Sequence, residues 1–206
     1  MKLVMKFNMY PNIKLLLFTV CTLTLNTSCV SQLKTQAGVP EISTSDYRDL
    51  LDKKTQKIEV YDGLYNILTV QASWLDSQLT EALLSQSARQ AQWSEQIYKE
   101  ERSKRVSKNT ESSDFFVSLF TPERKHTDLS KTKNLWKIFL EIDGVRYEGK
   151  ATKVKLLLSE IQALYPYHNR WSTPYVISFP VATSLVENKP AILTFTGAVG
   201  SAQLNY

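Results

Sequence analysis

Aromatic and hydrogen-bonding side chains alternate in one short stretch of the chain, residues 165–171 (YPYHNRW). Aromatic rings offer flat apolar faces, and the arginine guanidinium is a planar fork of hydrogen-bond donors. This combination suits contact with a glycan or a peptide. The sequence therefore predicts a ligand-binding site made of Tyr165, Tyr167, His168, Arg170 and Trp171. The alternative is that Tyr165 and Trp171 turn inward and close one end of the core.

The residue sets that catalysis or metal binding requires are incomplete. The chain has two histidines, His126 and His168, and no cysteine follows residue 29, whereas a structural zinc site takes four Cys or His ligands. The serines lack the Gly-x-Ser-x-Gly motif of a hydrolase nucleophile. We therefore predict no catalytic residues, no metal and no cofactor. An envelope hydrolase is the alternative, and it requires a serine, a histidine and a carboxylate to converge in the fold.

Short apolar alternations separated by turn residues follow residue 113 and predict antiparallel strands. The expected strands cover residues 115–121, 134–142, 145–148, 151–157, 175–182, 191–196 and 201–206. Alternation over residues 59–75 predicts one further strand, with a bend or bulge at Asp62-Gly63; a helix continuous with the next segment is the alternative. Strands with one apolar face must cover that face, so we expect an antiparallel two-sheet sandwich of the immunoglobulin-like or fibronectin-like kind.

Apolar residues at spacings of three and four predict one long helix inserted into this β-domain, over about residues 77–106. Asp76 or Ser77 supplies its N-cap. A second, short helix is expected to begin at Ser159, where Ser159 and Gln162 have the spacing of a capping box, and to end before Pro166. The expected fold class is therefore mainly β with a helical insertion, α+β.

The front of the chain has the pattern of a secretory signal. Lys2, Lys6 and Lys14 precede an eleven-residue apolar run, residues 15–25, and small polar residues follow it. Eleven residues are too few for a membrane-spanning helix, which needs about 20. We therefore expect residues 1–28 to be a signal peptide that directs export.

Thr27-Ser28-Cys29 resembles the lipobox of bacterial lipoproteins, with Asn26 at the position where a lipobox usually has leucine. The resemblance implies that Cys29 is lipidated and anchors the mature chain in a membrane. Cleavage by the ordinary signal peptidase is the alternative, and Cys21 is a competing lipidation site. Ser31 is not the aspartate that resembles an inner-membrane retention signal, so we expect the outer membrane, with the domain facing the periplasm.

The net charge does not indicate a nucleic-acid partner. The formal net charge is +5, and removing the three lysines of the expected signal peptide leaves +2. Nucleic-acid binders concentrate basic residues on one face, whereas here Lys and Arg are interleaved with Asp and Glu. We therefore predict no nucleic-acid binding.

The segment between the signal and the first expected strand is polar and rich in small residues. We interpret residues 29–56 as a lipid-anchored tether, with a short helical turn around Tyr47, Leu50 and Leu51, and residues 57–206 as the folded domain.

Four segments carry a resemblance to a known class of protein: FFVSLFTPERKH, the strand around Trp136, YPYHNRWSTPYVISFPV and TGAVGSAQLNY. They are similar to uncharacterised bacterial envelope lipoproteins, over most of residues 57–206. The resemblance implies a β-rich lipoprotein domain and supplies no catalytic residues. We therefore expect a non-catalytic structural or protein-interaction module, with an envelope protein or a cell-wall polymer as partner. The alternative is a carbohydrate- or peptidoglycan-binding domain that uses residues 165–171.

Overall fold

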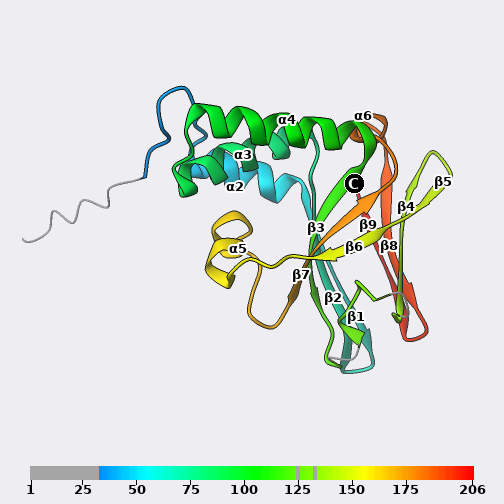
Figure 1. Ribbon diagram of the computed structural model, residues 1–206. Helices are drawn as coiled ribbons and strands as arrows, with labels where there is room; N and C mark the ends of the chain where they lie inside the picture. Colours follow the sequence, from blue (N-terminus) through cyan, green and yellow to red (C-terminus); the bar gives the residue numbers. More distant parts are fainter. Residues whose placement is uncertain (1–32, 124–125, 132–133) are drawn as a thin grey trace, which may run out of the picture. The chain divides into compact units, whose positions relative to one another are not determined.

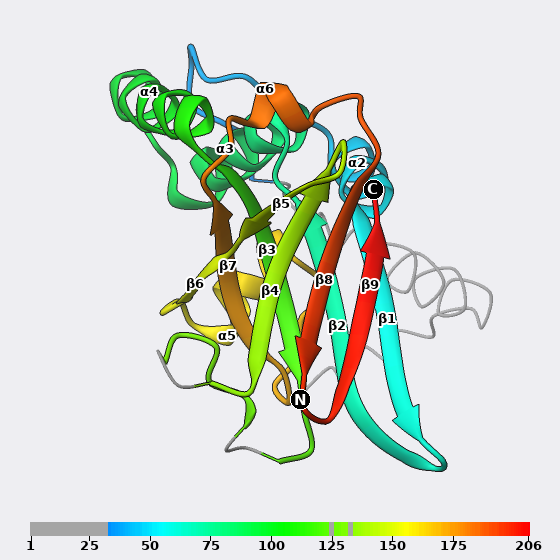
Figure 2. The same ribbon diagram turned by 90° about the vertical axis from the view of Figure 1, so that its right-hand side faces the viewer.

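Strands form a five-stranded and a four-stranded antiparallel sheet in the computed structural model, which describes residues 33–123, 126–131 and 134–206. The first sheet contains, in spatial order, β1 Thr55–Asp62, β2 Tyr65–Trp74, β3 Ser113–Phe120, β7 Thr173–Phe179 and β6 Lys150–Lys153. The second contains β5 Val145–Glu148, β4 Trp136–Ile142, β8 Ala191–Gly197 and β9 Gly200–Asn205 (Figures 1 and 2). The expected signal peptide and Cys29 lie outside the described residues.

The two sheets share one buried core, which confirms the predicted α+β fold with two antiparallel sheets. On β4, side chains alternate between buried and more exposed, as period-2 strands with one apolar face do. The core takes inward side chains from both sheets, among them Leu68, Val70, Phe115, Val117 and Ile177 from the first, and Trp136, Leu140, Leu193, Phe195 and Leu204 from the second.

Gly149 connects the two sheets, because it joins the end of β5 to the start of β6. Its N–H donates to the carbonyl of Ile138 in the second sheet at 2.8 Å. A Cβ atom at this position would lie 2.6 Å from the ring of Phe179 and 2.7 Å from a methyl group of Ile177, both in the first sheet. Only glycine fits without a shift of its neighbours, which is a common reason for glycine at a strand bend. At the opposite edge, β1 lies beside β9 (Figure 2).

Helices cover the outer face of the first sheet. The three that pack there are α2 Thr44–Lys53, α3 Ser77–Ala91 and α5 Leu158–Leu164 (Figure 1). A second apolar cluster forms around Phe116 of β3 and includes Tyr47, Leu51, Leu79, Ala82, Ile161 and Tyr165. The longer helix α4 Glu95–Glu111 packs on α3, and the short α6 Thr183–Val186 precedes β8. Among the described residues, no helix combines the length and the apolar character needed to cross a membrane.

The prediction of one long helix over residues 77–106 is wrong, because the structure has two helices there. Helix α3 ends at Ala91, and the following residue, Gln92, adopts the left-handed conformation with φ of 52°. Ser94 then caps α4 by accepting a hydrogen bond from the N–H of Ile97. Glycine is the usual residue at such a left-handed helix end, so glutamine at this position did not mark the break.

The single strand predicted over residues 59–75 is also wrong: this segment belongs to the hairpin β1–β2. Gly63, with φ of 58°, forms the turn. In one continuous strand Leu64, Leu68 and Val70 would point to the same face. Instead, Leu64 is fully exposed at the tip of the hairpin, whereas Leu68 and Val70 are buried.

The folded unit begins at Lys34 rather than at residue 57, so residues 34–56 are not a free tether. Tyr47 and Leu51 of α2 are each 1% exposed because they pack against α3 and α5. The cap of α5 also differs from the prediction. The carboxylate of Glu160 accepts a hydrogen bond of 2.7 Å from the N–H of Leu157, so the Ser159–Gln162 capping box does not form.

A candidate ligand-binding groove beside Trp171

The segment between α5 and β7 is held in shape by the side chain of Asn169. Its Oδ1 atom accepts hydrogen bonds from the N–H groups of Trp171, at 2.9 Å, and Ser172, at 3.2 Å. Asparagine commonly folds the following backbone into a turn in this way. The turn presents Trp171 outward, and 74% of this residue is exposed.

Tyr165 turns inward, as the alternative prediction proposed for it. Its ring stacks on that of Phe116, with ring centroids 3.5 Å apart and an angle of 3° between the planes. The preceding residue, Leu164, accepts a short hydrogen bond from the hydroxyl of Tyr47 on α2. Tyr165 therefore contributes to the helical layer and does not line a surface groove with Trp171.

Two hydrogen bonds fix the middle of the segment to the first sheet. The hydroxyl of Tyr167 lies 2.6 Å from Oγ of Ser73 on β2, and burial raises the pKa of Tyr167 well above its usual value. The Nδ1 atom of His168 lies 2.8 Å from Oγ of Ser118 on β3. His168 is 3% exposed, and burial lowers its pKa, so its imidazole is neutral at pH 7.

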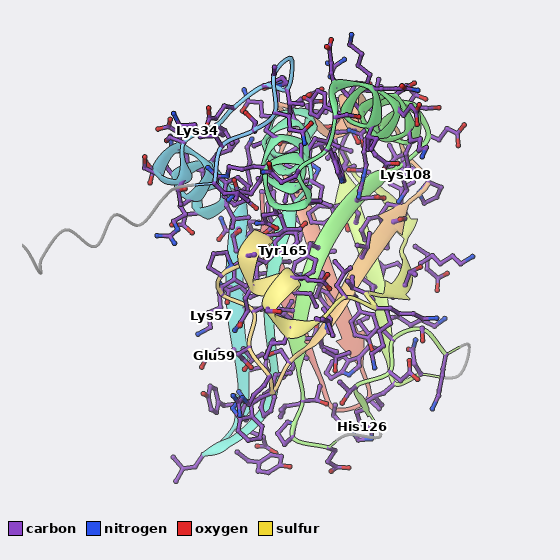
Figure 3. The ribbon with its side chains drawn as sticks, turned by 60° about the vertical axis from the view of Figure 1, so that its left-hand side comes forward. Lys34, Lys57, Glu59, Lys108, His126 and Tyr165 are labelled. Carbon is purple, nitrogen blue, oxygen red and sulfur yellow. The ribbon has the colours of Figure 1, made fainter. Side chains whose placement is uncertain are left out.

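The floor of the groove consists of outward side chains from three neighbouring strands. Strand pairing aligns them in two rows, Lys57–Gln71–Ser118 and Glu59–Thr69–Phe120. Residues on alternate positions of a strand point to the same face, so both rows lie on the outer face of the first sheet. Lys57 and Glu59 form a 2.5 Å ion pair at the rim, and Lys57 lowers the pKa of Glu59 (Figure 3).

Trp171 stands between this groove and a second hollow. The groove has a volume of about 490 Å³, and Tyr167, Asn169 and Trp171 form its wall above the two rows. The second hollow, about 460 Å³, is lined by Arg170 together with Lys153 and Asp128. Both volumes lie within the range of roughly 300–1,000 Å³ found for ligand pockets. We call the first hollow the Trp171 groove.

The predicted site residues therefore separate in the structure. Tyr167 and Trp171 line the Trp171 groove, His168 lies beneath it through Ser118, and Arg170 faces the second hollow. Sequence reasoning missed the floor residues Lys57, Glu59, Thr69, Gln71, Ser118 and Phe120. Most of them are polar residues at alternate positions of a strand, which could have indicated an exposed face. However, the prediction of one continuous strand over residues 59–75 did not include the pairing of β1 with β2 that brings these residues together.

The described residues do not complete a catalytic triad around the pair of Ser118 and His168. No carboxylate among them hydrogen-bonds or pairs with His168, and Ser118 is only 4% exposed. The other histidine, His126, lies in the loop after β3, with its Nδ1 atom 3.9 Å from a carboxylate oxygen of Glu123 (Figure 3). Within the described part of the chain, no three His, Cys, Asp or Glu side chains are grouped as metal ligands.

Comparison of the chain with protein-family models, with curated proteins and with solved structures gave no match.

Proposed function

We propose that this protein is a non-catalytic lipoprotein of the bacterial envelope that binds cell-wall glycan in the Trp171 groove. The observation that carries the proposal is the exposed indole of Trp171 beside two rows of mostly polar side chains. The envelope location rests on the signal-like residues 1–28 and the lipobox-like Cys29. An immunoglobulin-like arrangement of the two packed sheets belongs to the same proposal.

The chemistry of the groove suits a sugar chain. A pyranose ring has apolar C–H faces and polar hydroxyl edges, so its face can stack on an indole while its hydroxyls meet hydrogen-bonding groups. Gln71 and Thr69 offer an amide and a hydroxyl, and the pair of Lys57 and Glu59 offers charged donors and acceptors. Because Trp171 is exposed on the wall of the groove, its indole is accessible to an extended polymer.

Co-sedimentation of the detergent-solubilised full chain with isolated cell wall tests this function. We expect Trp171→Ala to weaken retention by about tenfold or more, equivalent to about 1.4 kcal/mol. The matched control is Trp93→Ala, which removes a half-buried indole outside the groove. Equal retention of the wild type and Trp171→Ala contradicts glycan binding at this groove.

A second candidate function, a protein-interaction module, is favoured by the tip of the β1–β2 hairpin. Leu64 is fully exposed there, and Tyr61 and Tyr65 are 53% and 56% exposed. Adjacent exposed apolar and aromatic side chains are typical of protein contact sites. In vivo cross-linking from a cross-linker placed at position 62, in the same hairpin tip, tests it. A specific cross-linked envelope protein that disappears in Leu64→Ser, with cell-wall retention unchanged, supports this function, and absence of any cross-link contradicts it.

A further inference from the structure

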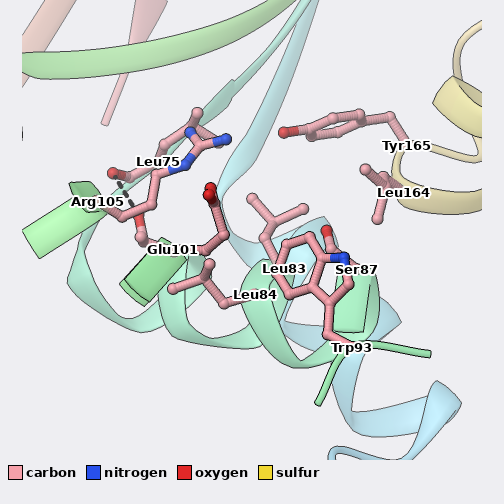
Figure 4. A pocket seen from close by; sticks show the side chains of 10 residues that line it. Leu75, Leu83, Leu84, Ser87, Trp93, Glu101, Arg105, Leu164 and Tyr165 are labelled. Atoms are coloured by element: carbon pink, nitrogen blue, oxygen red, sulfur yellow. Dashed lines mark hydrogen bonds between the residues drawn. The ribbon is translucent and has the colours of Figure 1, made fainter. Parts of the chain in front are cut away.

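A small hollow lies in the helical layer, between α3, α4 and α5 (Figure 4). Its volume is about 70 Å³. A water molecule needs roughly 10–15 Å³ measured in this way, so the hollow has room for about five waters or one small organic molecule. Apolar side chains, among them Leu83, Leu84, Leu164 and Trp93, line one part of the wall, and polar groups line the rest. It is separate from the Trp171 groove, with which it shares no lining residue.

The hydroxyl of Tyr165 points into this hollow without a partner (Figure 4). Tyr165 is 8% exposed, and stacking on Phe116 fixes its ring. No described residue forms a hydrogen bond with the hydroxyl, although hydrogen bonds are recorded for the neighbouring Tyr47 and Tyr167. The oxygen of this hydroxyl is not fully enclosed by protein atoms, so it remains free to form a hydrogen bond with a molecule in the hollow.

The guanidinium of Arg105 on α4 turns toward the same space (Figure 4). Among the described residues it has no ion pair, whereas Arg102 on the same helix pairs with Glu81 at 2.8 Å. The carboxylate of Glu101 also lines the hollow, but it is engaged by Lys104 at 2.6 Å. Burial raises the pKa of Tyr165, the positive charge of Arg105 opposes that rise, and the carboxylate of Asp114, which pairs with Lys108, adds to it. Arg105 is the one cationic side chain among the described residues that line the hollow, and because Lys104 engages Glu101, the guanidinium of Arg105 can pair with an anionic ligand.

We propose that this hollow binds a small monocarboxylate with a short apolar tail, of the size of propionate. The carboxylate accepts hydrogen bonds from the guanidinium of Arg105 and the hydroxyl of Tyr165, an arrangement that matches the planar fork of arginine. The tail lies against Leu83, Leu84 and Leu164. A fully hydrated anion such as phosphate does not suit this site, because the leucine side chains cannot replace its hydrogen bonds to water.

Thermal unfolding of the full chain in detergent tests the site, in a buffer free of carboxylates and phosphate. Sodium propionate is titrated against sodium chloride at equal ionic strength, with propionamide and sodium phosphate as parallel series. We expect a saturable rise in Tm with propionate alone. A rise of equal size with propionamide or phosphate, or no rise with propionate, overturns the proposal.

Two variants assign the response to the hollow. Tyr165→Phe keeps the stacked ring and removes only the unpartnered hydroxyl, so we expect an unchanged or higher Tm without ligand and at least tenfold weaker propionate binding. Arg105→Gln is expected to weaken binding to a similar or greater degree, whereas the control Arg48→Gln, on the exposed side of α2, leaves it unchanged. Saturation transfer from the protein to the propionate methyl group gives a readout independent of stability. If both Tyr165→Phe and Arg105→Gln transfer saturation to propionate as strongly as the wild type does, the assignment of the binding site to this hollow is wrong.

Discussion

The Nδ1 atom of His168 lies 2.8 Å from the Oγ atom of Ser118, and both residues are almost fully buried under the Trp171 groove. Fifty positions separate them in the sequence, so this contact fastens the segment after α5 to the first sheet. Charging the buried imidazole is unfavourable, which is why the pKa of His168 is lowered. The attachment of the groove wall is therefore linked to pH.

The free energy of unfolding is expected to fall as the pH falls below about 6.5, the ordinary pKa of histidine. In that range the unfolded chain binds a proton at His168 that the folded chain does not, so stability rises with pH, by at most about 1.4 kcal/mol per pH unit for this one group. The loss continues down to the lowered pKa of the folded state. Urea denaturation at several pH values measures it.

The control for this pH dependence is a comparison of two variants. His168→Asn keeps a hydrogen-bonding group near Ser118 and removes the titratable imidazole. The difference in unfolding free energy between this variant and the wild type should therefore change with pH below about 6.5. The control His126→Asn removes a histidine that does not line the Trp171 groove, and it should retain the pH dependence that His168 contributes. Parallel pH profiles for the wild type and His168→Asn would falsify the role of His168.

At Gly149 the chain passes from the second sheet to the first, and we expect this crossing not to tolerate a side chain. Gly149→Ala places a methyl group 2.6 Å from the ring of Phe179, so we expect a loss of about 1–3 kcal/mol in unfolding free energy, as for other overpacked cores. Gly200→Ala is the matched control, because its new methyl group would meet Val60 at an ordinary 3.7 Å. Similar stabilities for both variants in urea denaturation are inconsistent with a tight crossing at Gly149.

Membrane attachment is expected to depend on Cys29. Cys29→Ala should move the protein from the membrane fraction to the soluble fraction and abolish its labelling by radioactive fatty acid, because a covalently attached acyl chain supplies most of the membrane affinity. Cys21→Ala serves as the control and should retain both properties. The assignment of Cys29 fails if Cys29→Ala stays acylated.

Local alternation predicted most of the strands after residue 113, because each is short, apolar on one face and bounded by turn residues. The strand predicted over residues 151–157 is shorter in the structure and ends at Lys153. At Asp143-Gly144, both residues have positive φ, and this dipeptide marked the β4–β5 hairpin in the sequence. At Gly63 the same kind of signal was interpreted as a bend, because the residues on both sides continued one alternation. Gln92 gave no signal, since glutamine is not one of the residue types, such as glycine or asparagine, that commonly mark a left-handed helix end.

The candidate site was predictable only in part. Tyr165 and Trp171 are both aromatic residues in one segment, yet one is buried against Phe116 and the other is exposed. Which of the two side chains is buried depends on where α5 packs, and this packing is a tertiary interaction. The floor of the groove depends on strand register, since Lys57 meets Gln71 and Gln71 meets Ser118 only after three strands pair. The pairing register of the three strands cannot be predicted from the residue types alone.

Intrinsic fluorescence tests glycan binding at the Trp171 groove most directly. Of the four tryptophans, Trp74 and Trp136 are buried, Trp93 is half-buried and Trp171 is exposed. Titration with soluble fragments of cell-wall glycan should shift the emission toward shorter wavelength in a saturable way, because a stacked sugar ring shields the indole from water. The same titration of Trp171→Phe should show no shift. An unchanged spectrum of the wild type, or an equal shift in Trp171→Phe, contradicts glycan binding in this groove.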